Sequence, residues 1–286
     1  MKYAWIKGHI DQFPVAAMCR VIGVARSAFN AWRSNPHRKR DTFQAELAIK
    51  IEQVERDARG VYGSPRVTAE LNARGTHVSE NAVARCMKAR GIRAKTARRF
   101  VPRTTDSDHG HAVADNVLDR KFQASAPNRK WVCDITYIPT DQGWLYLAGV
   151  MDLFSRRIVG WSMGTRMPTE LVSDALAMAL QRRKPPAGLL HHSDRGVQYA
   201  SDDYQQLLKA HGIEASMSRR GDCYDNAAME SFWGTLKTEL VNHERYASPT
   251  QARQSIFEYI EVFYNRMRRH SSLGYVSPEA FEASRN

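Results

Sequence analysis

Cysteine is scarce in this sequence, and its few cysteines are arranged neither for disulfides nor for zinc. Cys19, Cys86, Cys133 and Cys223 lie far apart, and none belongs to a C-x-x-C pair or stands at ligand spacing from a histidine. In a cytosolic chain of 286 residues such cysteines are typically free thiols that fill the core. A disulfide-bonded domain and a zinc module are therefore not expected.

Long hydrophobic runs are also missing. The longest apolar stretch, "GWLYLAGVM" at residues 143–151, is far shorter than a membrane-spanning helix. The first residues, "MKYAWIKGHIDQF", carry charges where a secretory signal peptide needs its apolar segment. No Walker-type loop occurs, so ATP-driven chemistry is not expected. We predict a cytoplasmic protein without a membrane partner.

Negative charge is scarce in the first third of the chain only. Residues 1–100 contain 20 Lys and Arg against 8 Asp and Glu, whereas residues 101–286 contain 22 of each kind. The whole net charge of +12 therefore belongs to the first hundred residues. This asymmetry favours an N-terminal part that binds a polyanion, with nucleic acid as the partner. The alternative is a basic surface that only keeps the protein soluble.

Residues 13–33 show the pattern of a helix-turn-helix motif. Gly23 interrupts an apolar helical stripe, and Ser27 is placed to cap a second helix. In such a motif the first turn of the second helix meets base edges in the major groove. The side chains expected to contact DNA there are Arg26, Ser27 and Asn30. A helical hairpin that only holds a core would show a similar pattern.

A second helical unit follows a basic linker. A helix is predicted at 42–58, and a further pair is indicated by Pro65, a break at Gly75 and a cap at Ser79. The basic run at 93–99 fits both phosphate contact and a solvated linker. We therefore predict DNA-binding units at 1–40 and 41–100, a polar linker at 101–124, a catalytic core at 125–242 and a helical extension at 243–286.

The pattern changes to strands after residue 129. Residues 130–138 and 144–153 are rich in β-branched and aromatic residues, and the turn "DQG" between them predicts a hairpin. A third strand at 157–163 is followed by a helix from 169, a strand at 188–194, a helix at 201–212, a strand at 213–218 and a last helix. This order predicts the ribonuclease-H-like α/β fold, a mixed five-stranded sheet with helices, preceded by all-α helix-turn-helix units.

Three carboxylates are expected to meet at one edge of this sheet. Asp134 lies inside the first strand, where acidic residues are costly, and Asp194 ends the fourth. Glu230 lies in the last helix on a stripe with Asn226 and Lys237, which would face the DNA backbone. Converging carboxylates repel one another unless divalent cations bind, and all-oxygen ligands suit Mg²⁺ or Mn²⁺. Two such ions support in-line phosphoryl displacement.

The segments "WVCDITYI", "HHSDRGVQYAS", "GDCYDNAAMESFWGTLKTEL" and "FYNRMRRHSSLGYVSPEAF" resemble the insertion-sequence transposases of the DDE superfamily. They are similar to the second-reading-frame (OrfB) product of the bacterial group whose two frames are joined by ribosomal frameshifting, with a core like that of retroviral integrases. Asp194 and Glu230 have 35 residues between them, the spacing of the group's D-D-35-E signature. The resemblance implies that Asp134, Asp194 and Glu230 are catalytic and bind two Mg²⁺ or Mn²⁺ ions.

The resemblance also implies a reaction and partners. Water attacks the phosphodiester at the end of the element and frees a 3′-hydroxyl, which attacks a second phosphodiester and joins DNA strands. The partner is double-stranded DNA, on which the protein is at least a dimer, in the nucleoid of a bacterium. The resemblance leaves room for an active form fused to the product of the upstream frame. The zinc module of the integrase relatives is absent.

Residues near the three carboxylates have competing interpretations. Asp152, at the end of the second strand, could be a fourth ligand but fits a turn cap better. His191 and His192 face opposite sides of a strand, so at most one could approach the metals, and a structural role is favoured. Asp222 and Asp225 flank the start of the last helix, where capping accounts for at least one of them.

The C-terminal extension holds an apolar stripe and a basic cluster. The helix predicted at 249–267 has an apolar face that favours packing over function: Ala252, Ile256, Tyr259, Ile260, Phe263 and Met267. The basic cluster fits DNA contact and a solvated surface equally: Arg266, Arg268 and Arg269. Two other functions remain open on the sequence: a DNA-binding regulator of transposition without activity alone, and a ribonuclease-H-like nuclease.

Overall fold

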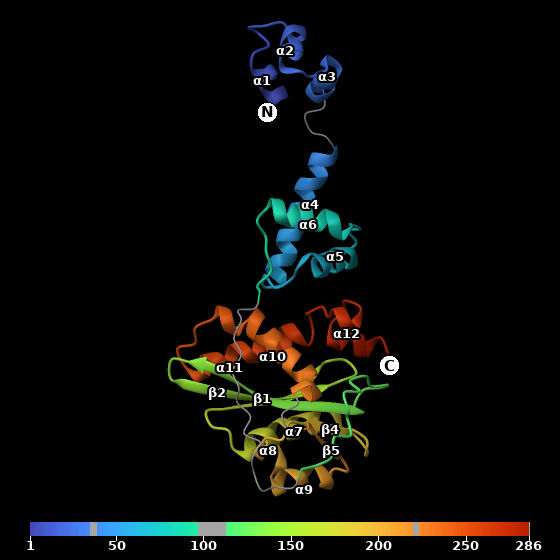
Figure 1. The fold of residues 1–286 in the computed structure, drawn as a ribbon, viewed down its shortest axis with the longest axis vertical. Helices are drawn as coiled ribbons and strands as arrows, with labels where there is room; N and C mark the ends of the chain where they lie inside the picture. The colour runs from blue at the N-terminus through green and yellow to red at the C-terminus, as the bar shows by residue number, and fades with distance from the viewer. Residues whose placement is uncertain (35–38, 97–112, 220–222, 286) are drawn as a thin grey trace.

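The computed structural model describes residues 1–34, 39–96, 113–219 and 223–285 (Figure 1). Three features of the sequence lie outside the described residues: the end of the basic run, with Arg98 and Arg99, the first half of the predicted linker, and Asp222. The side chain of Cys223 is not described either, whereas Cys19, Cys86 and Cys133 are buried free thiols, as predicted. No helix in the described part of the chain is long and apolar enough to cross a membrane.

The first three helices form a small unit with its own core. They are α1 (Lys2–Gly8), α2 (Val15–Ile22) and α3 (Arg26–Ser34), and their core consists of Ile6, Met18, Cys19 and Phe29. Gly23 ends α2 in the left-handed conformation with φ 69°, which glycine adopts without steric cost, so the predicted turn is confirmed. The predicted cap is wrong, because α3 already begins at Arg26 and Ser27 lies inside its first turn.

The second helical unit matches its sequence signals closely. Its helices are α4 (Lys39–Asp57), α5 (Ser64–Ala73) and α6 (Glu80–Ala89). Pro65 lies in the first turn of α5, and the Ser79 hydroxyl accepts a hydrogen bond from the backbone N–H of Ala82 at the start of α6. Leu47, Ile51, Val67, Leu71 and Val83 are buried in the same hydrophobic cluster as the helices that cover the sheet.

The catalytic part is built on a five-stranded sheet with strand order β3-β2-β1-β4-β5. The strands are β1 (Lys130–Thr140), β2 (Gly143–Asp152), β3 (Ile158–Gly164), β4 (Leu190–Ser193) and β5 (Glu214–Met217). The first three form an antiparallel meander, whereas β4 runs parallel to β1 and β5 parallel to β4. The predicted mixed sheet, and the predicted pairing of the first strand with the fourth, are confirmed.

Helices cover both faces of the sheet (Figure 1). One face carries α7 (Thr169–Arg183), α8 (Val197–Ala200) and α9 (Asp202–Ala210), whose apolar side chains pack with Trp131, Cys133 and Val150. The other carries α10 (Ala227–Glu239), α11 (Pro249–Glu258) and α12 (Pro278–Ala283). Sequence periodicity predicts most of these helices, because each buries an apolar stripe on the sheet.

The predicted helix at 249–267 changes geometry within its length. After α11 the chain continues as a π-helical stretch, Tyr259–Tyr264, which is a rarer backbone form. The predicted packing face is confirmed for five of its members, since Ala252, Ile256, Tyr259, Ile260 and Phe263 are buried. The prediction is wrong for Met267, because the π-helical turn shifts the register and leaves this side chain 48% exposed.

Candidate active site

Two neighbouring strands place two aspartates side by side. In the parallel pair formed by β1 and β4, Val132 lies opposite His192. Asp134 stands two residues further along β1, and Asp194 follows directly after the end of β4. Because side chains alternate with a period of two, both aspartates lie on the face of the sheet that α10 covers. The negative charge of Asp194 acts on Asp134 directly.

The carboxylate of Asp134 is held by two donors. Its Oδ1 accepts a hydrogen bond from the backbone N–H of Ile135 at 2.8 Å, and its Oδ2 accepts one from the indole N–H of Trp233 at 3.0 Å. Trp233 belongs to α10, so this bond joins the helix that carries Glu230 to the strand that carries Asp134. The arrangement fixes the direction of the carboxylate.

A glycine makes room for that tryptophan. Gly149 lies directly opposite Asp134 in the antiparallel hairpin. A Cβ atom at this position would meet the Trp233 ring at 2.9 Å and the Met229 methyl at 3.1 Å, both too close for a normal contact. Gly149 and Trp233 are positioning residues that sequence reasoning missed. A glycine placed opposite a strand aspartate in the predicted hairpin register was the available signal.

Asp194 stands at the turn that follows β4. Its Oδ1 accepts a hydrogen bond from the backbone N–H of Gly196 at 2.9 Å, which is an Asx-type turn. A Cβ atom on Gly196 would lie 2.9 Å from the same oxygen, so a side chain there would push on the carboxylate. The hydrogen bond from the backbone N–H of Gly196 therefore orients the carboxylate of Asp194.

Glu230 lies in the first turn of α10 and is exposed to solvent. Its charge reaches Asp134, where it adds to the repulsion from Asp194. Partial burial raises the pKa of Glu230 itself. Within the described chain, no three His, Cys, Asp or Glu side chains are grouped closely enough to hold a metal ion. The charges of Asp194 and Glu230 therefore act on Asp134, but the three carboxylates are not close enough together to form a metal-binding group.

Burial is the main influence on the titration of Asp134, and neighbouring carboxylates add to it. Burial, followed by the charge of Asp194 and then that of Glu230, raises the pKa of Asp134 to about 8, against the opposing effect of its two hydrogen bonds. A carboxyl with that pKa is largely protonated at neutral pH unless a cation offsets the neighbouring charges. The site thus favours the binding of a cation next to Asp134.

Two further residues of the predicted stripe flank the carboxylates. Lys237 lies with its ammonium nitrogen 4.9 Å from the centre of the Tyr137 ring, near enough to Asp134 to feel its charge, and burial lowers the pKa of Lys237. The Asn226 amide donates to the Cys133 carbonyl at 2.9 Å, which ties the start of α10 to β1. Its Oδ1 is buried with no partner among the described atoms. Burial of Asn226 speaks against the predicted DNA contact.

The two histidines beside Asp194 are structural. The His191 ring lies 2.8 Å from the Cys133 sulfur and 2.9 Å from the Tyr204 hydroxyl, and the His192 ring lies 2.9 Å and 3.1 Å from the hydroxyls of Ser216 and Ser218. Burial lowers the pKa of His191 to about 3 and that of His192 to about 4, so both rings are neutral. The predicted structural role fits these contacts.

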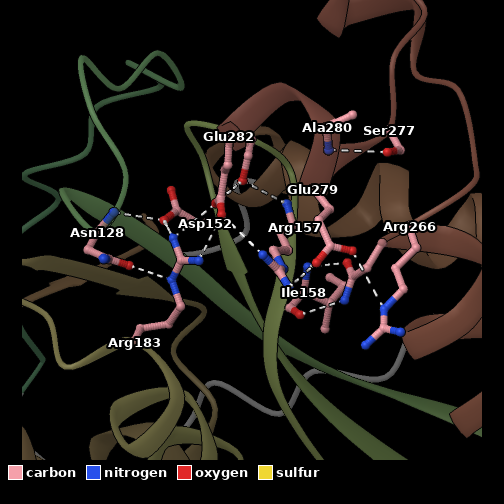
Figure 2. Close-up of polar contacts among 12 residues, drawn as sticks. Asn128, Asp152, Arg157, Ile158, Arg183, Arg266, Ser277, Glu279, Ala280 and Glu282 are labelled. Atoms are coloured by element: carbon pink, nitrogen blue, oxygen red, sulfur yellow. Dashed lines mark hydrogen bonds and ion pairs between the residues drawn. The ribbon is translucent and has the colours of Figure 1, made fainter. Parts of the chain in front are cut away.

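Asp152 is a structural residue as well (Figure 2). Its Oδ1 accepts from the backbone N–H of Phe154 at 2.9 Å and its Oδ2 from that of Asn128 at 2.7 Å. These bonds cap the turn after β2, as predicted, and Asp152 is fully buried. Figure 2 also shows Arg183 reaching both Asp152 and Glu282. Asp152 is therefore not placed to be a fourth metal ligand.

Asp225 does not cap the last helix. The residue at the N-cap of α10 is Asn226, which makes no side-chain cap bond. The Asp225 carboxylate instead accepts from Arg219, Arg120 and Asn116. The hydrogen bonds from Arg219 are the main reason that its pKa lies well below the usual range. Asp225 thus anchors the segment before α10 to the chain around residue 120.

The basic cluster in the C-terminal extension has mixed roles. The Arg268 guanidinium is 5% exposed and forms a bidentate ion pair with Glu239, so its predicted DNA contact is wrong. Arg269 pairs with Glu70 of α5 at 2.5 Å and donates to the Tyr275 carbonyl, joining the second helical unit to the extension. Arg266 is 62% exposed and lies 3.5 Å from Glu279. Of these three arginines, Arg266 alone is open to a DNA backbone.

The helix-turn-helix side chains are all on the surface. Arg26, Ser27 and Asn30 are exposed along the first turns of α3, while Phe29 on the opposite side is buried in the core of the unit. This arrangement leaves the predicted recognition face uncovered within the part of the chain that the structure describes.

Comparison with known proteins gives consistent matches along the chain. The family described as integrase core domain matches residues 124–223, a second family of that description matches residues 211–278, and a helix-turn-helix-like domain family matches residues 43–100. Transposase InsF for insertion sequence IS3A of Escherichia coli is 46% identical over 99% of this chain and 98% of its own length. The insertion element IS600 31 kDa protein of Shigella sonnei is 47% identical over 92% and 97%.

Solved structures resemble this one more distantly. The catalytic core domain of HTLV-2 integrase in complex with magnesium aligns with a TM-score of 0.43 and 15% identity, covering 56% of this chain and 99% of that chain. The aligned region is the core domain, and the identity is far below that of the transposase relatives.

Proposed function

This chain belongs to the transposases of IS3-type insertion sequences, polynucleotidyl transferases with an integrase core, and we propose that Asp134, Asp194 and Glu230 carry its chemistry. The observation that supports this assignment is the pKa of Asp134, which burial, the charge of Asp194 and that of Glu230 together raise to about 8. Each carboxylate comes from a different part of the fold, and the bond from Trp233 to Asp134 fixes the helix of Glu230 to the strand of Asp134.

The residues present fit divalent cations. Carboxylate oxygens are the donors that Mg²⁺ and Mn²⁺ prefer, and two such ions, when bound, activate an attacking oxygen and stabilise a leaving one. Asp134, Asp194 and Glu230 would hold them, and bound cations would relieve the repulsion around Asp134.

The reaction needs two in-line displacements at phosphorus. In the first, a water oxygen bonds to the phosphorus at the end of the element while the bond to the 3′ oxygen breaks, which leaves a free 3′-hydroxyl. In the second, that hydroxyl attacks a phosphodiester of the target strand and displaces its 3′ oxygen. One phosphodiester replaces another, so ATP is not consumed. The Trp233 and Gly196 donors keep two carboxylates oriented, and Lys237 is placed to meet a phosphate beside them.

The substrate is double-stranded DNA, held by several parts of the chain. The exposed first turns of α3 would contact base edges through Arg26, Ser27 and Asn30, and the second helical unit would add positive charge. Joining two ends of an element to a target requires at least two copies of the catalytic core, so we expect a dimer or higher oligomer on DNA. An active form fused to the product of the upstream frame is compatible with this scheme.

Strand cleavage and joining on labelled element-end DNA tests the proposal. Wild-type protein should cut and join in the presence of Mg²⁺ or Mn²⁺ and not in EDTA. Glu230→Gln should bind DNA and do neither. Glu170→Gln is the matched control, because Glu170 is also an exposed glutamate in the first turn of a helix, on the opposite face of the sheet. Cutting without joining would indicate a nuclease instead, and equal activity of wild type and Glu230→Gln would refute the assignment.

A further inference from the structure

A cavity of about 380 Å³ opens beside α10. Three segments far apart in the sequence meet there: α5, the turn between β2 and β3, and the loop after the π-helical stretch. Its polar walls consist of Arg66, Arg156, Arg268, His270, Ser271 and Ser272. Its floor is apolar, with Phe122, Phe232 and Tyr264. The volume is in the range of sites that bind small groups or single nucleotides.

The walls of this cavity carry more positive than negative charge. None of the described residues that line it is acidic, and three are arginines. The carboxylate of Glu239 already forms short bonds with Arg268, and Arg66 lies 3.9 Å from it. Arg156 has no hydrogen-bonded or ion-paired acceptor for its guanidinium among the described residues. Two guanidiniums of the cavity are therefore incompletely compensated, which favours an anion.

The backbone holds Arg156 in an unusual conformation beside this cavity. Arg156 has φ 61°, in the left-handed region that non-glycine residues seldom adopt. Its N–H donates to the Asp152 carbonyl at 2.8 Å, and its own carbonyl accepts from the Tyr264 hydroxyl at 3.2 Å. The turn and the tyrosine therefore fix the place from which the guanidinium reaches the cavity. Strained backbone of this kind is often found at binding sites.

His270 adds a neutral donor to the same walls. Burial, followed by the charges of Arg268, Arg66 and Arg156, lowers the pKa of His270 to about 3. Arg268 can only donate, so the Nε2 of His270, 3.3 Å from its Nη1, accepts that bond and the proton sits on Nδ1. The effect of three arginines on one ring also shows how closely their charges gather around it.

The cavity lies next to the candidate active site along α10. Ala227 and Ser231 line the cavity, and Glu230 is the neighbour of Ser231 in the helix. Ala227, Ser231 and Gly234 follow one another at i, i+4 and i+7, so they form a ridge of small side chains between the cavity and Glu230. Ser231 and Gly234 are exposed, which lets a backbone cross the helix at close range.

We propose that this cavity binds one backbone phosphate of a DNA strand that crosses α10 on its way to the carboxylates, with Arg156 and Arg66 as the charged partners. The proposal rests on the function proposed above. DNA is the source of the phosphate, because an open, adjacent ridge of small residues suits a continuous strand. The apolar floor suits the deoxyribose next to that phosphate. Arg156, Arg66 and His270 are thus positioning residues for the substrate.

The salt dependence of DNA binding tests the proposal, in EDTA so that no chemistry takes place. Removing one contact to a phosphate lowers the slope of log K against log salt by about 1. We expect Arg156→Gln and Arg66→Gln each to show that decrease, Arg156→Lys to keep most of the wild-type slope, and Arg182→Gln to keep all of it. Arg182 is the matched control, an arginine of α7 that is 40% exposed and paired with Glu261. Thermal melting verifies that each variant is folded.

A second measurement changes the charge of the DNA and uses Arg156→Gln only for comparison. A duplex in which single phosphates are replaced in turn by uncharged methylphosphonates should show one position that weakens binding to the wild type and not to Arg156→Gln. Slopes unchanged in both Arg156→Gln and Arg66→Gln, or an equal decrease in Arg182→Gln, would overturn the proposal. The proposal would also fail if inorganic phosphate raised the melting temperature of the wild type while Arg156→Gln bound DNA as well as the wild type does. A wild type that binds DNA but never cuts it would refute the proposed function alone.

Discussion

Two groups of acidic residues on this protein have opposite electrostatics. Around Glu282, the carboxylates of Asp152, Glu279 and Glu282 are met by Arg157 and Arg183, and these pairs tie α12 to the strands and to α7 (Figure 2). Around Asp134 and Glu230, no arginine is among the partners that the structure describes.

The pKa values record this difference between the two groups. Hydrogen bonds from Arg183 and Ser155 bring the pKa of Glu282 below its usual range although burial opposes them. Burial and neighbouring carboxylates bring the pKa of Asp134 to about 8. The comparison teaches that the surroundings of a buried acid, more than the residue type, distinguish a structural acid from a site that requires a bound cation.

The largest effect should come from neutralising a member of the second group. Asp134→Asn should lower the rate of strand cleavage about a thousandfold or more, because a metal ligand is removed. The fold should be retained, since the substitution removes a repelling charge. Single-turnover cleavage and thermal melting measure the two properties. A variant that cuts at the wild-type rate would show that Asp134 is not a ligand.

Glu282→Gln should show the opposite pattern, a loss of stability with the chemistry retained. Without the carboxylate, Arg183, which is 15% exposed, and Arg157 lose their buried partner. Breaking one side of a buried ion pair costs about 3–5 kcal/mol. Urea unfolding measures the change, and the cleavage rate of the folded fraction should stay at the wild-type value. Unchanged stability would mean that the arginines find solvent or another acid at no cost.

A substitution opposite Asp134 sharpens the comparison, because it removes no charged group. Gly149→Ala places a methyl group 2.9 Å from the Trp233 ring, so the ring must shift and its bond to Asp134 is disturbed. A misplacement of this kind costs about a hundredfold in rate. Trp233→Phe is the companion variant, since it deletes the donor while keeping an aromatic ring. If neither variant slows single-turnover cleavage, the indole does not orient the carboxylate.

The smallest effects concern the dependence of stability on pH, and their signs differ between the groups. Glu282 has a lowered pKa in the folded state, so its contribution is present above the unfolded pKa near 4.5 and is lost as the pH falls through the folded value. Asp134 has a raised pKa, so in EDTA its contribution is present below its unfolded pKa of 3.8 and is lost as the pH rises towards about 8.

Unfolding curves taken in EDTA across the pH range separate these two contributions. Asp134→Asn should gain stability relative to the wild type between about pH 4 and pH 8, and Glu282→Gln should lose the acid-sensitive part of the wild-type curve. Parallel curves for the wild type and Asp134→Asn would mean that Asp134 titrates normally.

The sequence predicts the part of the site that depends on local pattern. Alternating β-branched residues around Asp134, the strand end at Asp194 and the helical spacing of Glu230 and Lys237 are local signals, and the sheet order follows from their succession. Residues whose role depends on distant partners are harder to assign. Arg268 belongs to a basic cluster of the kind that contacts DNA, but its guanidinium forms a buried ion pair with Glu239, 29 positions earlier.

Contacts across the fold also decide the roles of small and polar residues. Gly149 carries only one signal in the sequence, its place opposite Asp134 in the hairpin, and the role of Trp233 appears only when α10 lies on that hairpin. Asp225 precedes a helix and has the position of a cap, yet arginines from before the helix and from the chain near residue 120 bind it instead. Periodicity cannot reveal such pairings, because they join elements about 100 residues apart.

Binding of Mn²⁺ to the protein–DNA complex, followed by electron paramagnetic resonance, tests the central claim most directly. The wild type and Glu282→Gln should bind tightly held Mn²⁺ to the same extent, whereas Asp134→Asn and Glu230→Gln should lose it. Equal Mn²⁺ binding by all four proteins would contradict the claim that Asp134 and Glu230 belong to the metal site.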